Sequence, residues 1–184
     1  MDGIVLMIDE HKNIKRMLKV IRKASIGIVK GGEIDYKDFE VMIDFVRNYA
    51  DKHHHGKEEK FLFNRMIDEI SGPAEKLVRY GMLVEHDFGR LYIMELEEAI
   101  SKVKAGEDEA KVDVIANAVG YANLLNRHID KEDNVVYSFA KRELSKETLN
   151  KINMECSEFE KEMDEAGVQD KYIEILKTLE QKYN

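Results

Sequence analysis

The sequence predicts an all-α fold, an up-down-up-down antiparallel four-helix bundle with additional C-terminal helices. The first observation is composition, because 43% of the 184 residues are hydrophobic and 36% are charged, with a single proline. This balance is typical of a soluble helical protein. The second observation is four long stretches with helical periodicity. The third is that only a few residues separate them, and short connections make long helices antiparallel neighbours.

The first two predicted helices end at helix-stopping residues. The first runs over about residues 3–28 and is followed by two glycines at 31–32, which stop a helix. The second begins near Asp35, which can cap its amino terminus, and continues to about residue 70. A Ser-Gly-Pro turn at 71–73 closes it and places proline in the first turn of the next helix.

The third and fourth helices are followed by a helical tail. The third is expected to reach about residue 104, and the fourth spans about residues 108–144. Ser145 can cap a further helix, and Gly167 divides the tail into two short amphipathic segments. We therefore expect a bundle domain at 1–144 and a helical C-terminal extension at 145–184, which packs on the bundle or forms the surface of a homodimer.

Charge and hydropathy exclude several classes of function. The net charge of −8 argues against nucleic acid, because nucleic-acid binding usually needs a basic surface. No apolar run approaches the roughly 20 residues of a membrane span, and the acidic amino terminus lacks the basic start of a secretory signal. The single cysteine, Cys156, rules out an internal disulfide framework and a cysteine zinc knuckle. We expect a reduced cytoplasmic protein without a membrane partner.

A repeated motif is the most informative feature of the chain. The pattern H-x-x-K-E-[E/D]-x-apolar-apolar-aromatic occurs at 54–63 and again at 128–137, an offset of 74 residues (54 to 128). A Glu-His pair at 10–11 returns at 85–86, an offset of 75 (10 to 85). A histidine and a glutamate four residues apart project from one face of a helix. The repeat therefore predicts one metal site built from two half-units.

Helical phase predicts which of these residues face the interior. The spacing 4-3-4-3 of a bundle seam holds in the fourth helix for Tyr121, Leu125, His128, Glu132, Val135 and Phe139. His128 and Glu132 therefore lie on the apolar stripe, and Asp133 is rotated away by roughly 100°.

The other three helices also direct histidines inward. His11 takes a place in the seam of the first helix, and His86 lies between apolar neighbours in the third. In the second helix, the side chains expected to share the inner face are His54, Glu58 and Phe61. Glu59 and Phe63 are expected to turn aside. Four imidazoles and two carboxylates therefore converge.

This set of donors points to metal. Charged carboxylates buried without partners cost many kcal/mol, and a cation compensates them better than histidine alone. Nitrogen and oxygen donors of this kind suit iron, manganese or zinc. With two divalent ions, the carboxylates can bridge and leave a position open for a small ligand.

The histidine run at 53–55 needs a separate assignment. The repeat aligns His54 with His128, so His53 is not expected to be a ligand. His55 lies roughly 100° from His54 on a helix, and it can reach a second ion from the bundle edge. Tyr121 and Tyr137 are expected to be core or rim residues.

These motifs resemble the hemerythrin-like, or HHE cation-binding, family over residues 1 to about 143. The resemblance implies a four-helix bundle with a non-haem di-iron centre, two iron ions joined by an oxo or hydroxide bridge, for which zinc or manganese can substitute. By position, it assigns the metal ligands to His11, His54, Glu58, His86, His128 and Glu132. His55 is a further candidate ligand.

The chain departs from the oxygen-carrying hemerythrins, which have H-x-x-x-H on the third helix and H-x-x-x-x-D on the fourth. Here Arg90 stands four residues after His86, so the second histidine is missing. The fourth-helix carboxylate follows its histidine by four residues, unless Asp133 replaces Glu132. If His55 is a ligand, it restores five histidines. The chain thus looks closer to the hemerythrin-like domains of bacteria, archaea and eukaryotic iron sensors.

Three functions fit this site, and the sequence leaves open whether the protein is an enzyme. The first is a di-iron protein that binds or senses oxygen, nitric oxide or iron. The second is a di-iron oxidoreductase acting on peroxide or nitric oxide. It would take electrons from a redox partner protein, because the chain has no Cys-x-x-Cys. The third is a structural or regulatory metal-binding protein.

Overall fold

The protein is helical throughout most of its length. The computed structural model describes residues 1–183, and no strand occurs among them. The first helix, α1 (Gly3–Val29), begins where the side chain of Asp2 accepts hydrogen bonds from the amides of Ile4 and Val5. It is followed by Gly31, whose φ of 89° suits a residue without a side chain. The predicted bounds of this helix agree with the structure.

The second helical stretch changes from α-helix to π-helix where the histidines lie. Asp35 caps it by accepting a hydrogen bond from the amide of Asp38, as predicted. Its elements are α2 (Tyr36–Phe45), the π-helical η1 (Val46–His55) and η2 (Glu58–Phe63), and α3 (Asn64–Ile70). Ser71, with a φ of 57°, ends the stretch at the predicted turn.

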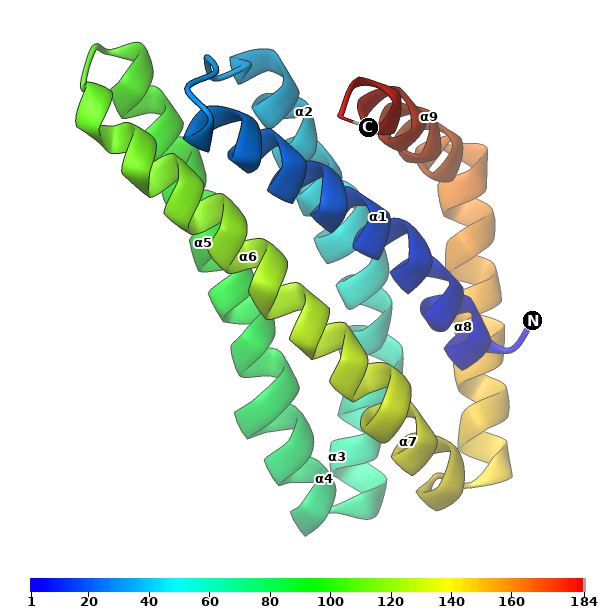
Figure 1. The fold of residues 1–184 in the computed structure, drawn as a ribbon. Helices are drawn as coiled ribbons and strands as arrows, with labels where there is room; N and C mark the ends of the chain where they lie inside the picture. Colours follow the sequence, from blue (N-terminus) through cyan, green and yellow to red (C-terminus); the bar gives the residue numbers. More distant parts are fainter. Residues whose placement is uncertain (184) are drawn as a thin grey trace.

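The third and fourth stretches repeat this construction. The third contains α4 (Gly72–Leu77), the π-helical η3 (Val78–Met82) and α5 (Leu83–Lys104). The fourth contains the 3₁₀ turn η4 (Asp108–Ala110), α6 (Lys111–Lys131), the π-helical η5 (Glu132–Val136) and α7 (Tyr137–Glu143). Figure 1 shows the four stretches lying side by side.

Two further helices follow the fourth stretch. Ser145 caps α8 (Lys146–Glu165), accepting a hydrogen bond from the amide of Thr148. Gly167, with a φ of 67°, separates α8 from α9 (Val168–Lys182). α8 packs against α1 and η2, and α9 packs against α1, α2 and η1 (Figure 1).

The π-helical turn η5 corrects the predicted inner face of the fourth stretch. A π-turn bonds residue i to i+5, so it shifts every later side chain relative to the 3.6-residue period. The predicted inward placement of Val135 and Phe139 is wrong, because Val135 is 52% exposed and Phe139 is half-buried. Val136 and Tyr137 are buried in their place.

The same shift occurs after Glu58 in the second stretch. Phe63 was expected to turn aside, yet it is fully buried, and Phe61 is only half-buried. Both π-turns begin at a glutamate of the repeated motif, η2 at Glu58 and η5 at Glu132. The repeat in sequence is therefore also a repeat in helical geometry.

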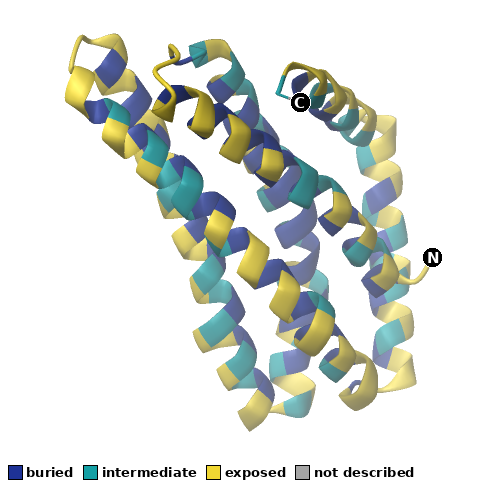
Figure 2. Ribbon diagram, in the orientation of Figure 1, coloured by how far each residue is buried: buried dark blue, intermediate teal, exposed yellow. Residues whose placement is uncertain are grey.

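A layer of buried polar residues divides the core in two. One apolar cluster contains Ile14, Ala50 and Leu125, and the other contains Met7 and Leu62. Along each of the four stretches, the motif histidines and glutamates fall between members of the two clusters. Figure 2 shows buried positions along the inner sides of the helices. This arrangement keeps water away from the polar layer on both sides.

Candidate metal centre

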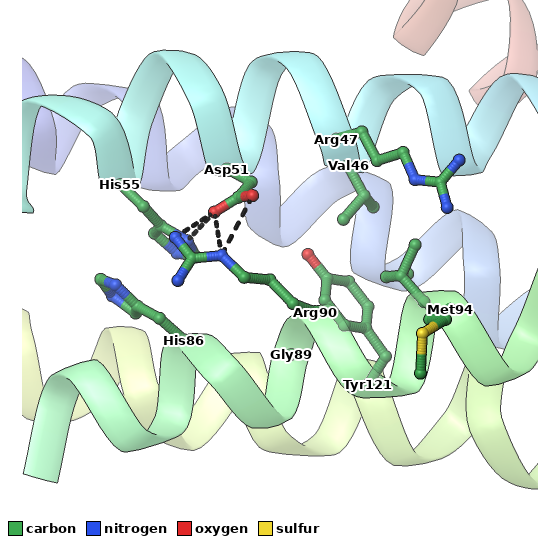
Figure 3. A pocket seen from close by; sticks show the side chains of 10 residues that line it. Val46, Arg47, Asp51, His55, His86, Gly89, Arg90, Met94 and Tyr121 are labelled. Atoms are coloured by element: carbon green, nitrogen blue, oxygen red, sulfur yellow. Dashed lines mark hydrogen bonds and ion pairs between the residues drawn. The ribbon is translucent and has the colours of Figure 1, made fainter.

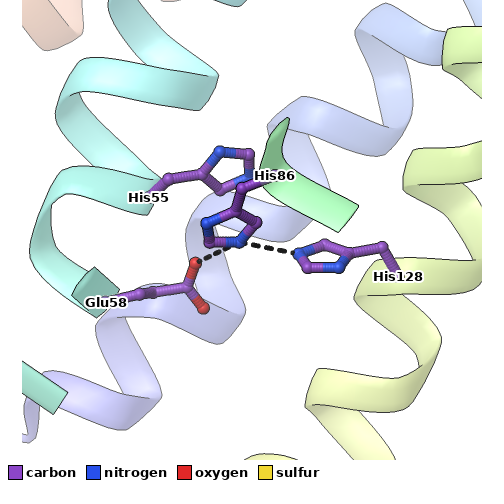
Figure 4. A group of neighbouring side chains, drawn as sticks. All are labelled: His55, Glu58, His86 and His128. Atoms are coloured by element: carbon purple, nitrogen blue, oxygen red, sulfur yellow. Dashed lines mark hydrogen bonds and ion pairs between the residues drawn. The ribbon is translucent and has the colours of Figure 1, made fainter. Parts of the chain in front are cut away.

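The polar layer contains five histidines and two glutamates from all four stretches. Each of these seven residues is at most 4% exposed. They form two groups whose donor atoms lie within 4.8 Å of one another, and both groups include Glu58. The first group is His55, Glu58, His86 and His128, and the second is His11, His54, Glu58 and Glu132. Figure 4 shows the first group.

Both glutamates lie between the histidines of the two groups. Glu58 Oε2 is 3.6 Å from Nε2 of His54 on one side and 3.6 Å from Nε2 of His86 on the other. Glu132 has one oxygen 3.3 Å from Nε2 of His11 and the other 3.0 Å from Nε2 of His128. Metal on either side could therefore be held by these carboxylates, with three histidines on one side and two on the other.

The second ring nitrogen of every histidine in the layer is held by a carboxylate. Nδ1 donates from His11 to Asp133 (2.7 Å), from His54 to Glu10 (2.8 Å), from His55 to Asp51 (3.3 Å), from His86 to Glu59 (2.7 Å) and from His128 to Glu85 (2.9 Å). Such carboxylates fix the ring orientation and make the opposite nitrogen a better metal ligand. All five Nε2 atoms thus face the centre, where they could act as metal ligands.

The inner atoms are poorly satisfied by the protein alone. Within residues 1–183, four buried atoms of the layer have no hydrogen-bond partner: Nε2 of His54, Oε2 of Glu58 and both carboxylate oxygens of Glu132. The approaches of Glu132 to His11 and His128 are close but lack hydrogen-bonding geometry. Buried polar groups are rarely left in this state, because each costs free energy. A cation among these atoms would satisfy all of them, so the residues fit a metal.

Burial and mutual charge displace the pKa values of both carboxyl groups. Burial, together with the nearby charge of Glu132, raises the pKa of Glu58 well above its usual value. Burial has the same effect on Glu132, but the charge of His128 and contact with other histidines outweigh it and hold its pKa well below the usual value. The pKa values of the two neighbouring carboxyl groups are therefore shifted in opposite directions.

The pKa values of the histidines are also shifted in opposite directions. Burial opposes their charged form, yet nearby carboxylates raise the pKa of His11 to about 9 and that of His128 to about 10. Burial and neighbouring imidazoles lower the pKa of His55 to about 3 and hold that of His54 well below its usual value. Protons thus occupy the layer at neutral pH, and a metal ion must displace them.

The structure brings together all seven residues predicted from the sequence, although their role as ligands stays a prediction. Glu132 is the carboxylate that lies in the layer, and Asp133 lies behind His11. His55 is in the layer, stacked on His86 with ring centroids 3.8 Å apart. His53 lies outside it, with its Nε2 2.9 Å from Glu160.

Tyr137 contributes more than sequence reasoning assigned to it. Its hydroxyl donates to Oε1 of Glu58 at 2.6 Å, and its ring stacks on His11 at 5.7 Å. The carboxylates behind the histidines were also missed, because they come from other helices or from other turns. A signal was present for Glu10 and Glu85, since each precedes a motif histidine. Each serves the histidine of a neighbouring helix.

A cavity of about 280 Å³ lies against the outer side of His55 and His86 (Figure 3). Gly89 contributes no side chain to its wall, and the buried hydroxyl of Tyr121 has no hydrogen-bond partner within residues 1–183. Arg90 lies at its edge, paired with Asp51 at 2.7 Å. The cavity gives a small molecule a place beside two of the histidines.

Together, these features define a helical protein with an interior centre suited to metal ions. The chain belongs to the hemerythrin HHE cation-binding domain family, whose model matches residues 2–140. The matched region contains every residue of the polar layer, and the resemblance found in the sequence is confirmed. Comparisons with curated proteins and with solved structures gave no match. Within residues 1–183, no helix combines the length and apolar character needed to cross a membrane.

Proposed function

We propose that the chain is an up-down-up-down four-helix bundle around a dinuclear iron centre, and that it binds or senses oxygen, nitric oxide or iron itself. The observation that carries the proposal is the pair of buried donor groups that share Glu58 and contain unequal numbers of histidines. Nitrogen and oxygen donors suit iron, and they also accept zinc or manganese.

The proposed centre has two unequal positions. The three-histidine position would be held by His55, His86 and His128, and the two-histidine position by His11 and His54, with Glu58 and Glu132 between them. When bound, two ferrous ions would supply electrons and coordinate a small molecule. The two-histidine position, with one histidine fewer, is where we expect that molecule to bind.

The protein's own residues shape this position. Tyr137 donates to Glu58 and lies 3.5 Å from Nε2 of His11, so its hydroxyl is beside the two-histidine position. The apolar residues above and below the polar layer exclude water, and this protects reactive species from solvent. Residues such as Leu125 and Phe63 supply that cover, because both are fully buried.

Metal analysis combined with a visible spectrum tests the proposal. We expect aerobically purified protein to carry two iron ions per chain and to show oxo-bridged ferric bands that change on reduction and re-oxygenation. As a control, Glu95→Ala, a change at an exposed position, should give the same iron content and the same spectrum as the wild-type protein. A colourless protein with stoichiometric zinc would contradict the proposal and favour a structural or regulatory metal.

A second candidate function is a di-iron oxidoreductase acting on peroxide or nitric oxide. The cavity beside His55 and His86 favours it, because the cavity lies against the three-histidine position and a small substrate can approach the centre from that side. Electrons would come from a redox partner protein. Stopped-flow decay of peroxide added to the reduced protein is the measurement, and absence of turnover with any electron donor would exclude this function.

A further inference from the structure

Lys57 is a lysine buried completely beside the polar layer. Its side chain is 0% exposed, and its ammonium donates to carboxylate oxygens of Glu10 and Glu160. Nε2 of His53 lies 3.3 Å away. An ammonium without water is costly unless its charge is compensated, and two carboxylates supply that compensation here.

These contacts connect the C-terminal extension to the metal centre. Glu10 uses one oxygen for Lys57 and the other for Nδ1 of His54, at 2.8 Å. A continuous chain of direct contacts therefore runs from Glu160 on α8 through Lys57 and Glu10 to His54. His54 is a residue of the proposed two-histidine position.

The chain of contacts is complete in only one half of the repeat. Lys131, the counterpart of Lys57, donates to Glu85, which holds His128 in the same way. Lys131, however, is 49% exposed, and no residue of α8 or α9 is paired with it within residues 1–183. Solvent screens such an exposed pair, so it contributes little. This chain of contacts from the extension thus reaches the first half alone.

The cluster formed by Glu10, His53, Lys57 and Glu160 is not a third metal site. Donor atoms of Glu10, His53 and Glu160 lie within 4.8 Å of one another, as a metal would require. The ammonium of Lys57 is hydrogen-bonded to both carboxylates and already supplies the positive charge. The cluster is therefore a charged support held together by protein groups.

We propose that Lys57 and Glu160 are positioning residues for the two-histidine position, through which helix α8 sets the affinity of that position for metal. They fix Glu10, and Glu10 fixes the ring of His54. This inference rests on the proposed dinuclear centre. Partners behind a metal ligand typically change metal affinity by about 10–100-fold, and we expect the lower part of that range because Glu160 acts through two intermediates.

The test is a titration of the metal-free, full-length protein with Co²⁺, whose visible bands report the geometry of each position. Wild-type protein should bind two equivalents. In Glu160→Gln, one equivalent should bind about tenfold more weakly, with altered bands, while the other keeps its affinity. Glu158→Gln, the same change at an exposed position of α8, should leave both equivalents unchanged.

A second variant and a double variant separate positioning from folding. Lys57→Met should weaken binding of the same Co²⁺ equivalent. Lys57→Met combined with Glu160→Gln should weaken it no more than the larger single change does, because both changes break the same series of contacts. Far-UV circular dichroism verifies the fold of each variant. Unchanged affinity in folded Glu160→Gln, or equal weakening of both equivalents, would overturn the proposal. Wild-type protein that binds fewer than two equivalents would overturn the dinuclear centre itself.

Discussion

The two halves of the metal centre follow one plan and differ at a few positions. The matched pairs are His11 with His86, His54 with His128, Lys57 with Lys131, Glu58 with Glu132, and Phe63 with Tyr137. The carboxylates behind the histidines match as well, because Glu10 holds His54 as Glu85 holds His128. The repeat therefore accounts for a symmetric arrangement of four histidines with two carboxylates between them.

The differences make the two positions unequal. The first half has His55 where the second has Ile129, and His55 adds a fifth histidine to the layer. Phe63 stacks on His86 at 5.9 Å, while its counterpart Tyr137 stacks on His11 and adds a hydroxyl. The repeated motif thus supplies the residues that the two halves of the polar layer share, and single differences between the halves make the layer asymmetric.

The largest expected effect tests what the halves share. Glu58→Ala and Glu132→Ala should each abolish retention of the metal pair, because each carboxylate lies between both groups of histidines. Metal content per chain, measured by elemental analysis after desalting, is the readout. If both variants keep wild-type metal content, the assignment of the centre is wrong.

Removing the main asymmetry should have the next largest effect. His55→Ile gives the first half the residue of the second half and removes one nitrogen donor. The metal affinity of the three-histidine position should therefore fall by more than the 10–100-fold typical of losing a partner behind a ligand. Titration with Co²⁺ measures each equivalent. Ile129→Val, a mild change at the matching position, serves as control. Equal affinity in His55→Ile and wild type would remove His55 from the ligand set.

Proton competition should act on both positions alike. His11 and His128, with pKa values raised to about 9 and about 10, carry protons at pH 7 that a metal must displace. Affinity should therefore rise from pH 7 to 9, by roughly tenfold per pH unit for each proton released. The metal-free fold should lose stability over the same window, since raised histidine pKa values stabilise it only at lower pH. Calorimetry in two buffers of different ionisation enthalpy counts the protons, and a flat profile would contradict the assigned protonation.

The carboxylates behind the histidines allow a matched comparison. Glu59→Gln acts on His86 and Asp133→Asn on His11, so each should weaken its own metal position by about 10–100-fold. Competition with a chelator gives both affinities. Complete loss of the metal pair in Asp133→Asn would instead make Asp133 the ligand in place of Glu132.

The smallest effect concerns the cavity. Gly89 stands where the first half has the buried Ile14, and a Cβ there would lie 3.4 Å from a methyl group of Leu125. Gly89→Ala should stabilise the fold by about 0.5–1 kcal/mol through helix propensity and narrow the cavity. Gly120→Ala should destabilise it instead, because its Cβ would come within 2.6 Å of the Tyr92 ring. Thermal unfolding distinguishes the two.

Local signals predicted the helices well, and tertiary geometry limited the rest. Asp35 and Ser145 cap their helices as expected, because capping depends on a few neighbouring residues. The inner face after Glu132 was mispredicted, since the π-turn η5 departs from the 3.6-residue period on which the prediction rests. Glu160 could not be placed at all, because its partner Lys57 is 103 residues away.

The π-helical turns also link the proposed metal centre to the backbone of the bundle. η2 begins at Glu58 and η5 begins at Glu132, so in two of the four stretches the helix type changes at a glutamate of the polar layer. If both glutamates hold metal, a change of coordination would act on the backbone where the hydrogen-bonding pattern of the helix itself changes.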